Sequence, residues 1–193
     1  MSTNGKQQEG GEPISTSVEV LEREQSTQRI LSAASAVIND LQTRPESRNV
    51  TFKAASHLSE GLYAKINIRK FHLASDEPET LGGTDRAPNP VELILGAFGA
   101  CQEIVISAYA AVLAIKVDSV SVEANGTLDL AGFFNVANVR PGYHTIEYTT
   151  TIQTRETDEA KLNQLVYFAQ NRCPVLDILQ NPVNVKGNFK FSR

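Results

Sequence analysis

Two cysteines, Cys101 and Cys173, are the residues of this 193-residue chain best suited to chemistry. A thiolate is a nucleophile, so each sulfur is reactive only where its surroundings stabilise the negative charge. Two thiols can also act together, when one is oxidised and the other attacks it to form a disulfide. Because free cysteines are common core residues, the pair has two interpretations from spacing alone: redox-active or structural.

The two sulfurs are predicted to have different surroundings. Cys101 lies about eleven residues inside a long apolar helix, roughly 16 Å from its start at 1.5 Å per residue. The helix dipole fades within the first turn, so a thiolate at Cys101 needs a cationic side chain from another segment. Cys173 precedes Pro174, which suits the first position of a helix, and this predicts a sulfur at a helix N-terminus that favours its thiolate.

The predicted elements give an α+β fold of antiparallel sheets packed around a buried central helix. That helix covers residues 90–114 and is apolar on nearly every face. After it, Thr157 or Asp158 is predicted to cap another helix. Alternating or β-branched segments predict strands at residues 50–56, 62–73, 116–130, 142–154 and 184–191.

The chain is predicted to have three parts. Residues 1–25 are rich in Gly, Ser and Thr with few large apolar side chains, which favours a disordered or extended tail. Residues 26–45 carry apolar side chains at helical spacing and end at Pro45, which predicts an accessory helix. Residues 49–193 form the main domain.

Composition argues against several classes of function. Lys and Arg number 18 against 22 Asp and Glu, a net charge of -4 without a basic cluster, so nucleic acid and membranes are not expected partners. No signal-peptide pattern opens the chain, which predicts a cytoplasmic protein with reduced thiols. His57, His72 and His144 show no ligand spacing with the cysteines, so neither a metal nor another cofactor is expected.

Two motifs, each containing one cysteine, match signatures of a known family. The first is Asn89-Pro90-Val91-Glu92-Leu93 before a small-residue helix that reaches Ala100-Cys101, and the second is Cys173-Pro174-Val175 before a short helix and a last strand. With these motifs the chain resembles the OsmC/Ohr family of osmotically induced and organic hydroperoxide resistance proteins, in its OsmC-like branch. The resemblance covers about residues 50–191.

The resemblance implies a thiol-dependent peroxidase that works as an intertwined homodimer. Cys101 would attack a hydroperoxide, preferably an organic one, and become a sulfenic acid, and Cys173 would then close an intramolecular disulfide. A dithiol reductant, such as a lipoyl group, would restore the thiols. The contrasting hypothesis is a noncatalytic dimer that binds a small apolar ligand or senses thiol redox state.

The resemblance also suggests further site residues. The family supplies an Arg from an early strand to hold the first thiolate, for which Arg69 is the best match and Arg86 the second candidate. It also places an orienting Glu directly after the Asn-Pro pair, where this chain has Val91. Glu92 comes one residue later, turned by about 100° on a helix. We therefore take Cys101, Cys173, Arg69 and Glu92 as candidate catalytic residues, and as candidate substrate contacts Arg86, Phe98, Phe133 and Phe134.

Overall fold

The computed structural model describes residues 17–192, and their side chains from residue 21 onward. It divides into two compact units, Met1–Glu46 and Ser47–Arg193, which are described separately. The predicted main domain, residues 49–193, falls within the second unit.

The first unit contains the helix α1 (Ser17–Thr43). The sequence predicted its start at residue 26, yet residues 17–25 are already helical, so this part of the predicted tail is corrected. The Thr27 hydroxyl donates to the Arg23 carbonyl oxygen at 3.0 Å, so it bonds to the preceding turn of the same helix. The predicted tail from residue 1 to residue 16 lies outside the described residues.

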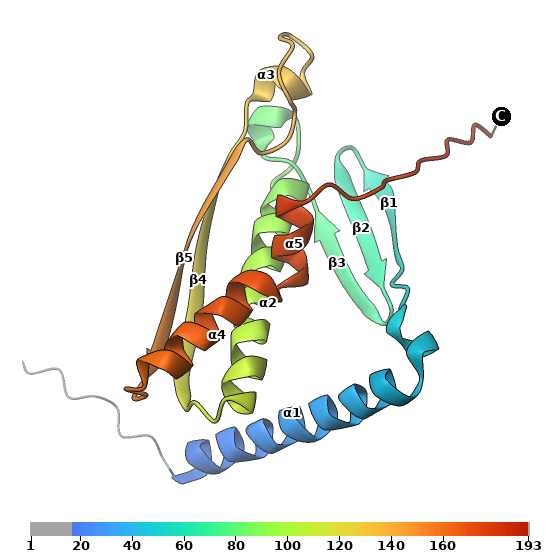
Figure 1. Cartoon of the computed structure of the whole chain (residues 1–193). Coiled ribbons are helices and arrows are strands. Elements are labelled where there is room, and N and C mark those ends of the chain that lie inside the picture. The colour runs from blue at the N-terminus through green and yellow to red at the C-terminus, as the bar shows by residue number, and fades with distance from the viewer. Residues whose placement is uncertain (1–16, 193) are drawn as a thin grey trace, which may run out of the picture. The chain divides into compact units, whose positions relative to one another are not determined.

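The second unit begins with a three-stranded antiparallel sheet in the order β1-β2-β3 (Figure 1). Its strands are β1 (Ala54–Glu60), β2 (Tyr63–Ile68) and β3 (Phe71–Ser75). The single strand predicted over residues 62–73 is therefore two strands with a tight turn at Arg69 and Lys70. Ile68 pairs with Phe71 across this turn, and Arg69 has a φ of 54°. The prediction failed because the turn lacks the Gly or Asn that usually adopts this conformation.

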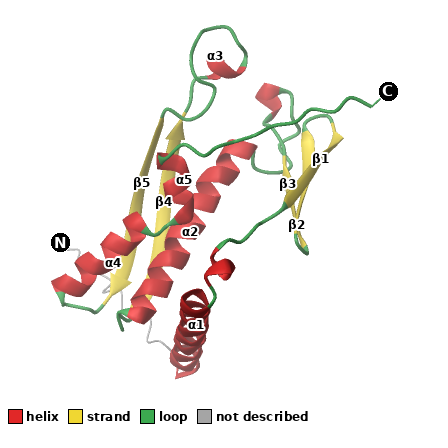
Figure 2. Ribbon diagram, turned by 45° about the vertical axis from the view of Figure 1, so that its right-hand side comes forward, coloured by secondary structure: helices red, strands yellow, loops and turns green. Residues whose placement is uncertain are grey.

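The second sheet pairs β4 (Val117–Thr127) with β5 (Thr145–Thr154), as the alternating pattern predicted. The short helix α3 (Leu130–Phe133) follows β4. The long helix α2 (Pro90–Val112) packs against β4, and against α4 (Glu159–Asn171) and α5 (Pro174–Gln180) on another side (Figure 2). Asp158 caps α4, as expected, by accepting from the backbone N–H groups of Ala160 and Lys161.

Two apolar clusters form the core between these elements. One joins α2 to α4, and its members are Ile106, Ala110, Ile115, Leu165 and Ala169. The other joins α2 to the start of α5, and its members are Phe98, Val105, Cys173 and Leu176. Both clusters draw on α2, so this helix organises the core of the second unit.

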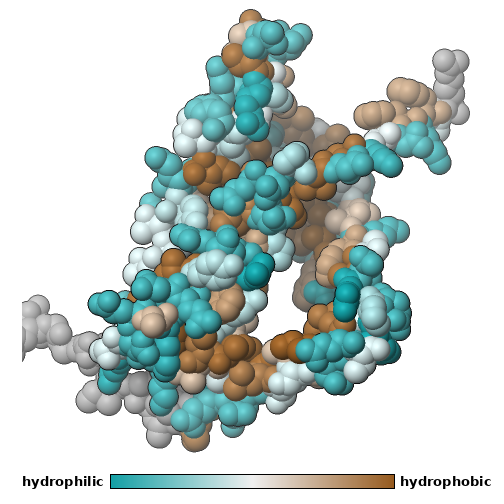
Figure 3. All heavy atoms as spheres, in the orientation of Figure 1, coloured by the Kyte–Doolittle hydropathy of each residue, from teal (hydrophilic) through white to brown (hydrophobic). Residues whose placement is uncertain are grey.

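One side of α2 remains exposed in the single chain, although its composition predicted burial all round. Ile104 is 69% exposed and Val112 is 55% exposed. Apolar side chains are visible on the surface in the region of α2 and α5 (Figure 3). The helix is also long and apolar enough to cross a membrane by composition, a test that core helices pass as well. The described chain alone covers only part of its apolar surface.

The end of the chain is a second difference from the prediction. Residues 184–191 were expected to form a strand, but the structure shows no strand there. Their large apolar side chains are among the most exposed of the molecule, with Val185 at 86% and Phe191 at 93%. An alternating pattern forms a strand only against a hydrogen-bonding neighbour, and no described strand pairs with this segment.

Candidate functional site

Cys101 and Cys173 lie side by side, with 3.2 Å between their sulfur atoms. Cys101 lies in α2 and is half-buried, and Cys173 is the residue that precedes α5. Both are free thiols, and the Cys173 S–H group donates toward the Cys101 sulfur. Because a disulfide requires about 2.05 Å between the sulfur atoms, a small shift of the side chains is enough to bridge them.

The structure places Cys173 at a helix N-terminus, as its Pro174 neighbour predicted. The Leu176 backbone N–H donates to the Cys173 sulfur at 3.4 Å. The prediction that this position favours the Cys173 thiolate is nevertheless wrong. Burial raises the pKa of Cys173 above its ordinary value, and the neighbouring Cys101 adds to this, while the Leu176 N–H lowers it by less. The resting state of Cys173 at neutral pH is therefore the thiol.

The sulfurs are surrounded by apolar side chains. Phe98 is fully buried and shares a cluster with Cys173, Val105 and Leu176, with Cys101 packed against its edge. Its ring meets Tyr148 of β5 edge-on, with 4.9 Å between ring centres. The structure therefore brings Phe98 to the cysteines, and a ligand reaching them meets hydrocarbon.

Exposure and pKa together predict which thiol reacts first with an alkylating reagent. Cys173 is 2% exposed and its pKa is raised, whereas Cys101 is half-buried. We expect limiting iodoacetamide to modify Cys101 before Cys173, because only an accessible thiolate reacts. Peptide mass spectrometry after short reaction times measures this order. Labelling in urea is the control, where the two rates should converge; faster native labelling of Cys173 would contradict the prediction.

Arg69 is not at the sulfurs in the single chain. It lies in the exposed β2–β3 turn, with its guanidinium 5.1 Å from the centre of the Phe71 ring. Lys70 occupies the same turn, and its ammonium nitrogen lies 5.6 Å from the centre of the same ring. Within residues 17–192, no hydrogen bond or ion pair joins Arg69 to either cysteine.

Arg86 belongs to a separate polar network. Its guanidinium lies 4.2 Å from the centre of the Tyr63 ring, and its Nε donates to the Thr84 hydroxyl at 2.8 Å. It also pairs with Glu60 at 3.4 Å and lies 3.9 Å from Asp76. These partners belong to the first sheet and to the loop before α2, so the structure does not bring Arg86 to the cysteines.

Asp76 organises that loop. It is 2% exposed, and its carboxylate accepts from the Thr84 hydroxyl at 2.6 Å and from the backbone N–H groups of Glu77, Thr84 and Arg86. The Thr84 bond is the main reason why the pKa of Asp76 is lowered, and burial opposes it. The Ser75 hydroxyl donates to the Pro88 carbonyl at 3.0 Å, which closes the loop just before α2 begins.

Replacing Asp76 with Asn is expected to lower the free energy of unfolding at pH 7, because an amide cannot accept all four hydrogen bonds as a carboxylate does. The folded pKa is lower than the unfolded value, so the carboxylate stabilises the fold above pH 3.8 and loses this effect as the pH falls through its folded pKa. The difference between wild type and Asp76→Asn should therefore shrink in acid. Urea unfolding at pH 7 and in acid measures the free energy of unfolding of the two proteins.

Asp85→Asn is the matched control for this prediction. Asp85 lies in the same loop, is exposed and has a φ of 52°, a conformation that Asn tolerates. We expect little change from it at either pH. Equal effects of the two substitutions would show that the Asp76 carboxylate does not hold the loop.

Glu92 acts in the structure as a helix cap. Its carboxylate accepts from the Asn89 backbone N–H at 2.8 Å, and the Asn89 side chain accepts from the Glu92 N–H at 2.8 Å. This capping box fixes the start of α2. Cys101 comes nine residues later, about 13.5 Å along the helix axis, so the structure does not bring Glu92 to the sulfurs.

Phe133 and Phe134 lie in and beside α3, where they are 65% and 54% exposed. Their rings meet edge to face, with 5.0 Å between the ring centres. They are not members of the cluster around the sulfurs. As substrate contacts they remain a prediction.

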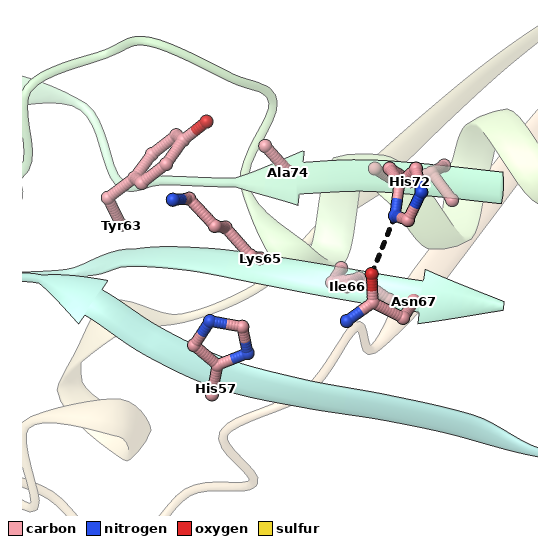
Figure 4. A pocket seen from close by; sticks show the side chains of 8 residues that line it. His57, Tyr63, Lys65, Ile66, Asn67, His72 and Ala74 are labelled. Atoms are coloured by element: carbon pink, nitrogen blue, oxygen red, sulfur yellow. Dashed lines mark hydrogen bonds between the residues drawn. The ribbon is translucent and has the colours of Figure 1, made fainter.

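A cavity of about 370 Å³ on the first sheet went unrecognised in the sequence. His72 lies in its wall with its Nδ1 atom 2.7 Å from the Asn67 amide oxygen (Figure 4). These two polar side chains lie on one face because Asn67 of β2 pairs directly with His72 of β3. The cavity is lined by His57, Tyr63, Lys65, Ile66, Asn67, His72, Leu73 and Ala74. Neither cysteine lines it. In the described part of the chain, no group of three or more His, Cys, Asp or Glu side chains could hold a metal ion.

Comparisons with known proteins agree with this architecture. The family model described as OsmC-like protein matches residues 83–188. No curated protein sequence matches the chain. A Mycoplasma pneumoniae OsmC-like protein is similar in structure, with a TM-score of 0.59 and 16% identity over 69% of this chain and 90% of that one.

Two further solved structures are similar to this chain. An organic hydroperoxide resistance protein OsmC from Legionella pneumophila has a TM-score of 0.52 and 25% identity, over 71% of this chain and 94% of that one. An organic hydroperoxide resistance protein from Elizabethkingia anophelis has a TM-score of 0.52 and 19% identity, over 69% of this chain and 91% of that one.

Proposed function

We propose that this chain, which belongs to the OsmC-like protein family, is a thiol-dependent peroxidase that reduces organic hydroperoxides with Cys101 and Cys173. The observation that carries the proposal is the 3.2 Å separation of the two sulfur atoms. The similar Legionella protein is described as an organic hydroperoxide resistance protein and predicted redox protein, which supports a peroxide-related role.

The reaction begins at Cys101, the more accessible sulfur. Its thiolate attacks one oxygen of the O–O bond, an S–O bond forms, and the other oxygen leaves and takes a proton to become an alcohol. Sulfur loses two electrons to the peroxide and becomes a sulfenic acid. Cys173 then attacks the Cys101 sulfur, the S–O bond breaks, and the oxygen leaves as water. An external dithiol reduces the resulting disulfide.

The surroundings of the sulfurs favour organic over inorganic peroxides. Phe98, Val105 and Leu176 line this region with hydrocarbon, so an alkyl or aryl hydroperoxide gains contacts that hydrogen peroxide lacks. We also propose that Phe133 and Phe134 make additional apolar contacts with the hydroperoxide. A reducing cytoplasm, which keeps both cysteines as thiols, suits this cycle.

The cation that an ionised Cys101 needs is proposed to come from Arg69 in a homodimer. The exposed apolar side of α2, which includes Ile104 and Val112, supports association with a second copy. The exposed apolar side chains of residues 183–191 support it as well. Arg69 is itself exposed in its turn and has no carboxylate partner among the described ion pairs, so it is available to act across such an interface.

The proposal is tested by stopped-flow reaction of the reduced protein with cumene hydroperoxide, followed by mass spectrometry. We expect fast consumption and a Cys101–Cys173 disulfide in the wild type. Arg69→Ala should lose most of the rate, because a cation beside the sulfur favours the thiolate. Lys70→Ala, in the same turn, is the matched control. Slow consumption by the wild type, at the rate of a Cys101→Ser variant, would refute the peroxidase.

A second candidate function is a thiol redox sensor or apolar-ligand binder without turnover. Among the described residues, the hydrogen-bond partner of the Cys101 sulfur is Cys173 and not a cation, and Glu92 is engaged in the helix cap, which favours this alternative. It predicts that peroxide oxidises the protein slowly and that Arg69→Ala leaves the rate unchanged. The stopped-flow comparison therefore separates the two functions.

A further inference from the structure

Gln102, the residue after Cys101, is a buried polar side chain with no part in the proposed peroxide chemistry. It is 1% exposed, and its Nε2 donates to the Ala169 carbonyl oxygen at 3.1 Å. Ala169 lies in the last turn of α4, where carbonyl groups lack a hydrogen-bond partner within the helix. Gln102 therefore satisfies a helix-end carbonyl and ties α2 to the C-terminal end of α4.

This hydrogen bond connects the two backbone segments that carry the sulfurs. Gln102 is bonded covalently to Cys101, and Ala169 comes four residues before Cys173. From Ala169 the chain ends α4, passes Arg172 and reaches Cys173 directly before α5. One buried side-chain amide thus links α2 to the end of α4. The relative position of these two segments sets the distance between the sulfur atoms.

Apart from this link and the hydrogen bond from the Leu176 N–H to its sulfur, the support for Cys173 is apolar and less directional. Cys173 and Leu176 pack with Phe98 and Val105, contacts that stabilise burial without fixing a single orientation. A hydrogen bond has a preferred length and angle, so it restricts the position of α4 more tightly than packing does. The Gln102–Ala169 bond is a long-range contact between α2 and α4, whose partners are 67 positions apart in sequence.

We propose that Gln102 is a positioning residue that holds Cys173 beside Cys101 for disulfide formation. Its role in turnover rests on the proposed function. In this step the Cys173 sulfur bonds to the Cys101 sulfur of the sulfenic acid, the S–O bond breaks, and hydroxide leaves with a proton as water. The sulfurs must approach from 3.2 Å to about 2.05 Å. A misplacement of about 1 Å can slow such a step about 100-fold.

The test replaces Gln102 with Met, which is similar in length and has no donor. We expect disulfide formation after peroxide addition to slow by about tenfold or more. The sulfenic acid should persist and be trapped by dimedone. Oxidation of Cys101 itself, measured in a Cys173→Ser background, should not change, because Gln102 acts on the second step. Disulfide formation at the wild-type rate would overturn the proposal.

A matched control separates positioning from a general loss of packing. Ile106→Val removes one buried methyl group from the cluster that joins α2 to α4 and also contains Ala169, without touching a polar group. We expect it to lower the urea midpoint while leaving the rate of disulfide formation unchanged. Equal slowing by Ile106→Val and Gln102→Met at equal stability would overturn the proposal. Gln102→Asn, which keeps the amide but is one methylene shorter, serves if Gln102→Met does not fold.

Equilibration with a glutathione redox buffer tests the inference without peroxide. This equilibrium measures the effective concentration of the Cys101 thiol at Cys173. We expect that effective concentration to fall by about tenfold or more in Gln102→Met. If the wild type does not turn over peroxide but Gln102→Met still lowers this effective concentration, the peroxidase fails and the positioning role stands. If peroxide is consumed and the effective concentration is unchanged, the positioning role fails alone.

Discussion

Replacing Cys101 with Ser is expected to abolish peroxide consumption, with a loss of at least about 100-fold, because no other group in the site replaces the nucleophile. A serine hydroxyl is not ionised at neutral pH and does not form a sulfenic acid. The substitution removes one sulfur from a half-buried position, so the fold should be retained. Stopped-flow measurement with cumene hydroperoxide gives the rate, and circular dichroism checks the fold.

Cys173→Ser is the matched variant and should behave differently. It leaves Cys101 intact, so one equivalent of peroxide should react and leave a sulfenic acid that dimedone traps on Cys101. The disulfide cannot form, and excess peroxide should drive the sulfur on to sulfinic acid. Mass spectrometry distinguishes these products. Equal loss of the first reaction in both variants would contradict the assignment of Cys101 as the attacking sulfur.

The meeting of the cysteines was predicted by the family resemblance, whereas local rules predicted only the place of each cysteine on its own helix. Asn89, Pro90 and Glu92 set the start of α2 through a capping box, and Pro174 sets the start of α5. These signals depend only on neighbours in sequence. The alternating strands β4 and β5 form because each supplies the other with a hydrogen-bonding partner. The family motifs then indicate that two locally determined elements belong to one site. The distance between the sulfurs is consistent with that interpretation.

The errors arise where a segment depends on something beyond its own sequence. Arg69 was read as a strand residue because the residues on both sides are β-formers, and nothing local marks the turn between Ile68 and Phe71. The segment 184–191 alternates correctly, yet a strand needs a neighbour that the described chain does not provide. Gln102 could not be recognised because its partner, the Ala169 carbonyl, is defined only once α4 ends.

The raised pKa of Cys173 shows a different limit of prediction from sequence. Its place at a helix N-terminus was predicted correctly, and the Leu176 N–H does donate to the sulfur. The sign of the net effect was still wrong, because burial outweighs that hydrogen bond. Local sequence gives the hydrogen-bond geometry, whereas burial depends on how α5 packs against α2. The pKa is therefore a property of the tertiary structure.

The largest effect on stability is expected from Phe98→Ala. The Phe98 ring is fully buried between Cys173, Leu176 and Tyr148, so its removal leaves a cavity. We expect a loss of about 3–5 kcal/mol in the free energy of unfolding, the usual range for a buried aromatic residue. Urea unfolding followed by circular dichroism measures it.

Phe134→Ala is the control for this substitution, because Phe134 is 54% exposed and should change stability by about 0.5 kcal/mol or less. Phe98 also supports Cys173, so Phe98→Ala should slow disulfide formation as well as destabilise the fold. Gln102→Met should slow the same step with a smaller loss of stability, because it removes the hydrogen bond to Ala169 but keeps the volume of the side chain. If Phe98→Ala unfolds no more easily than Phe134→Ala, the apolar cluster does not hold Cys173 in place.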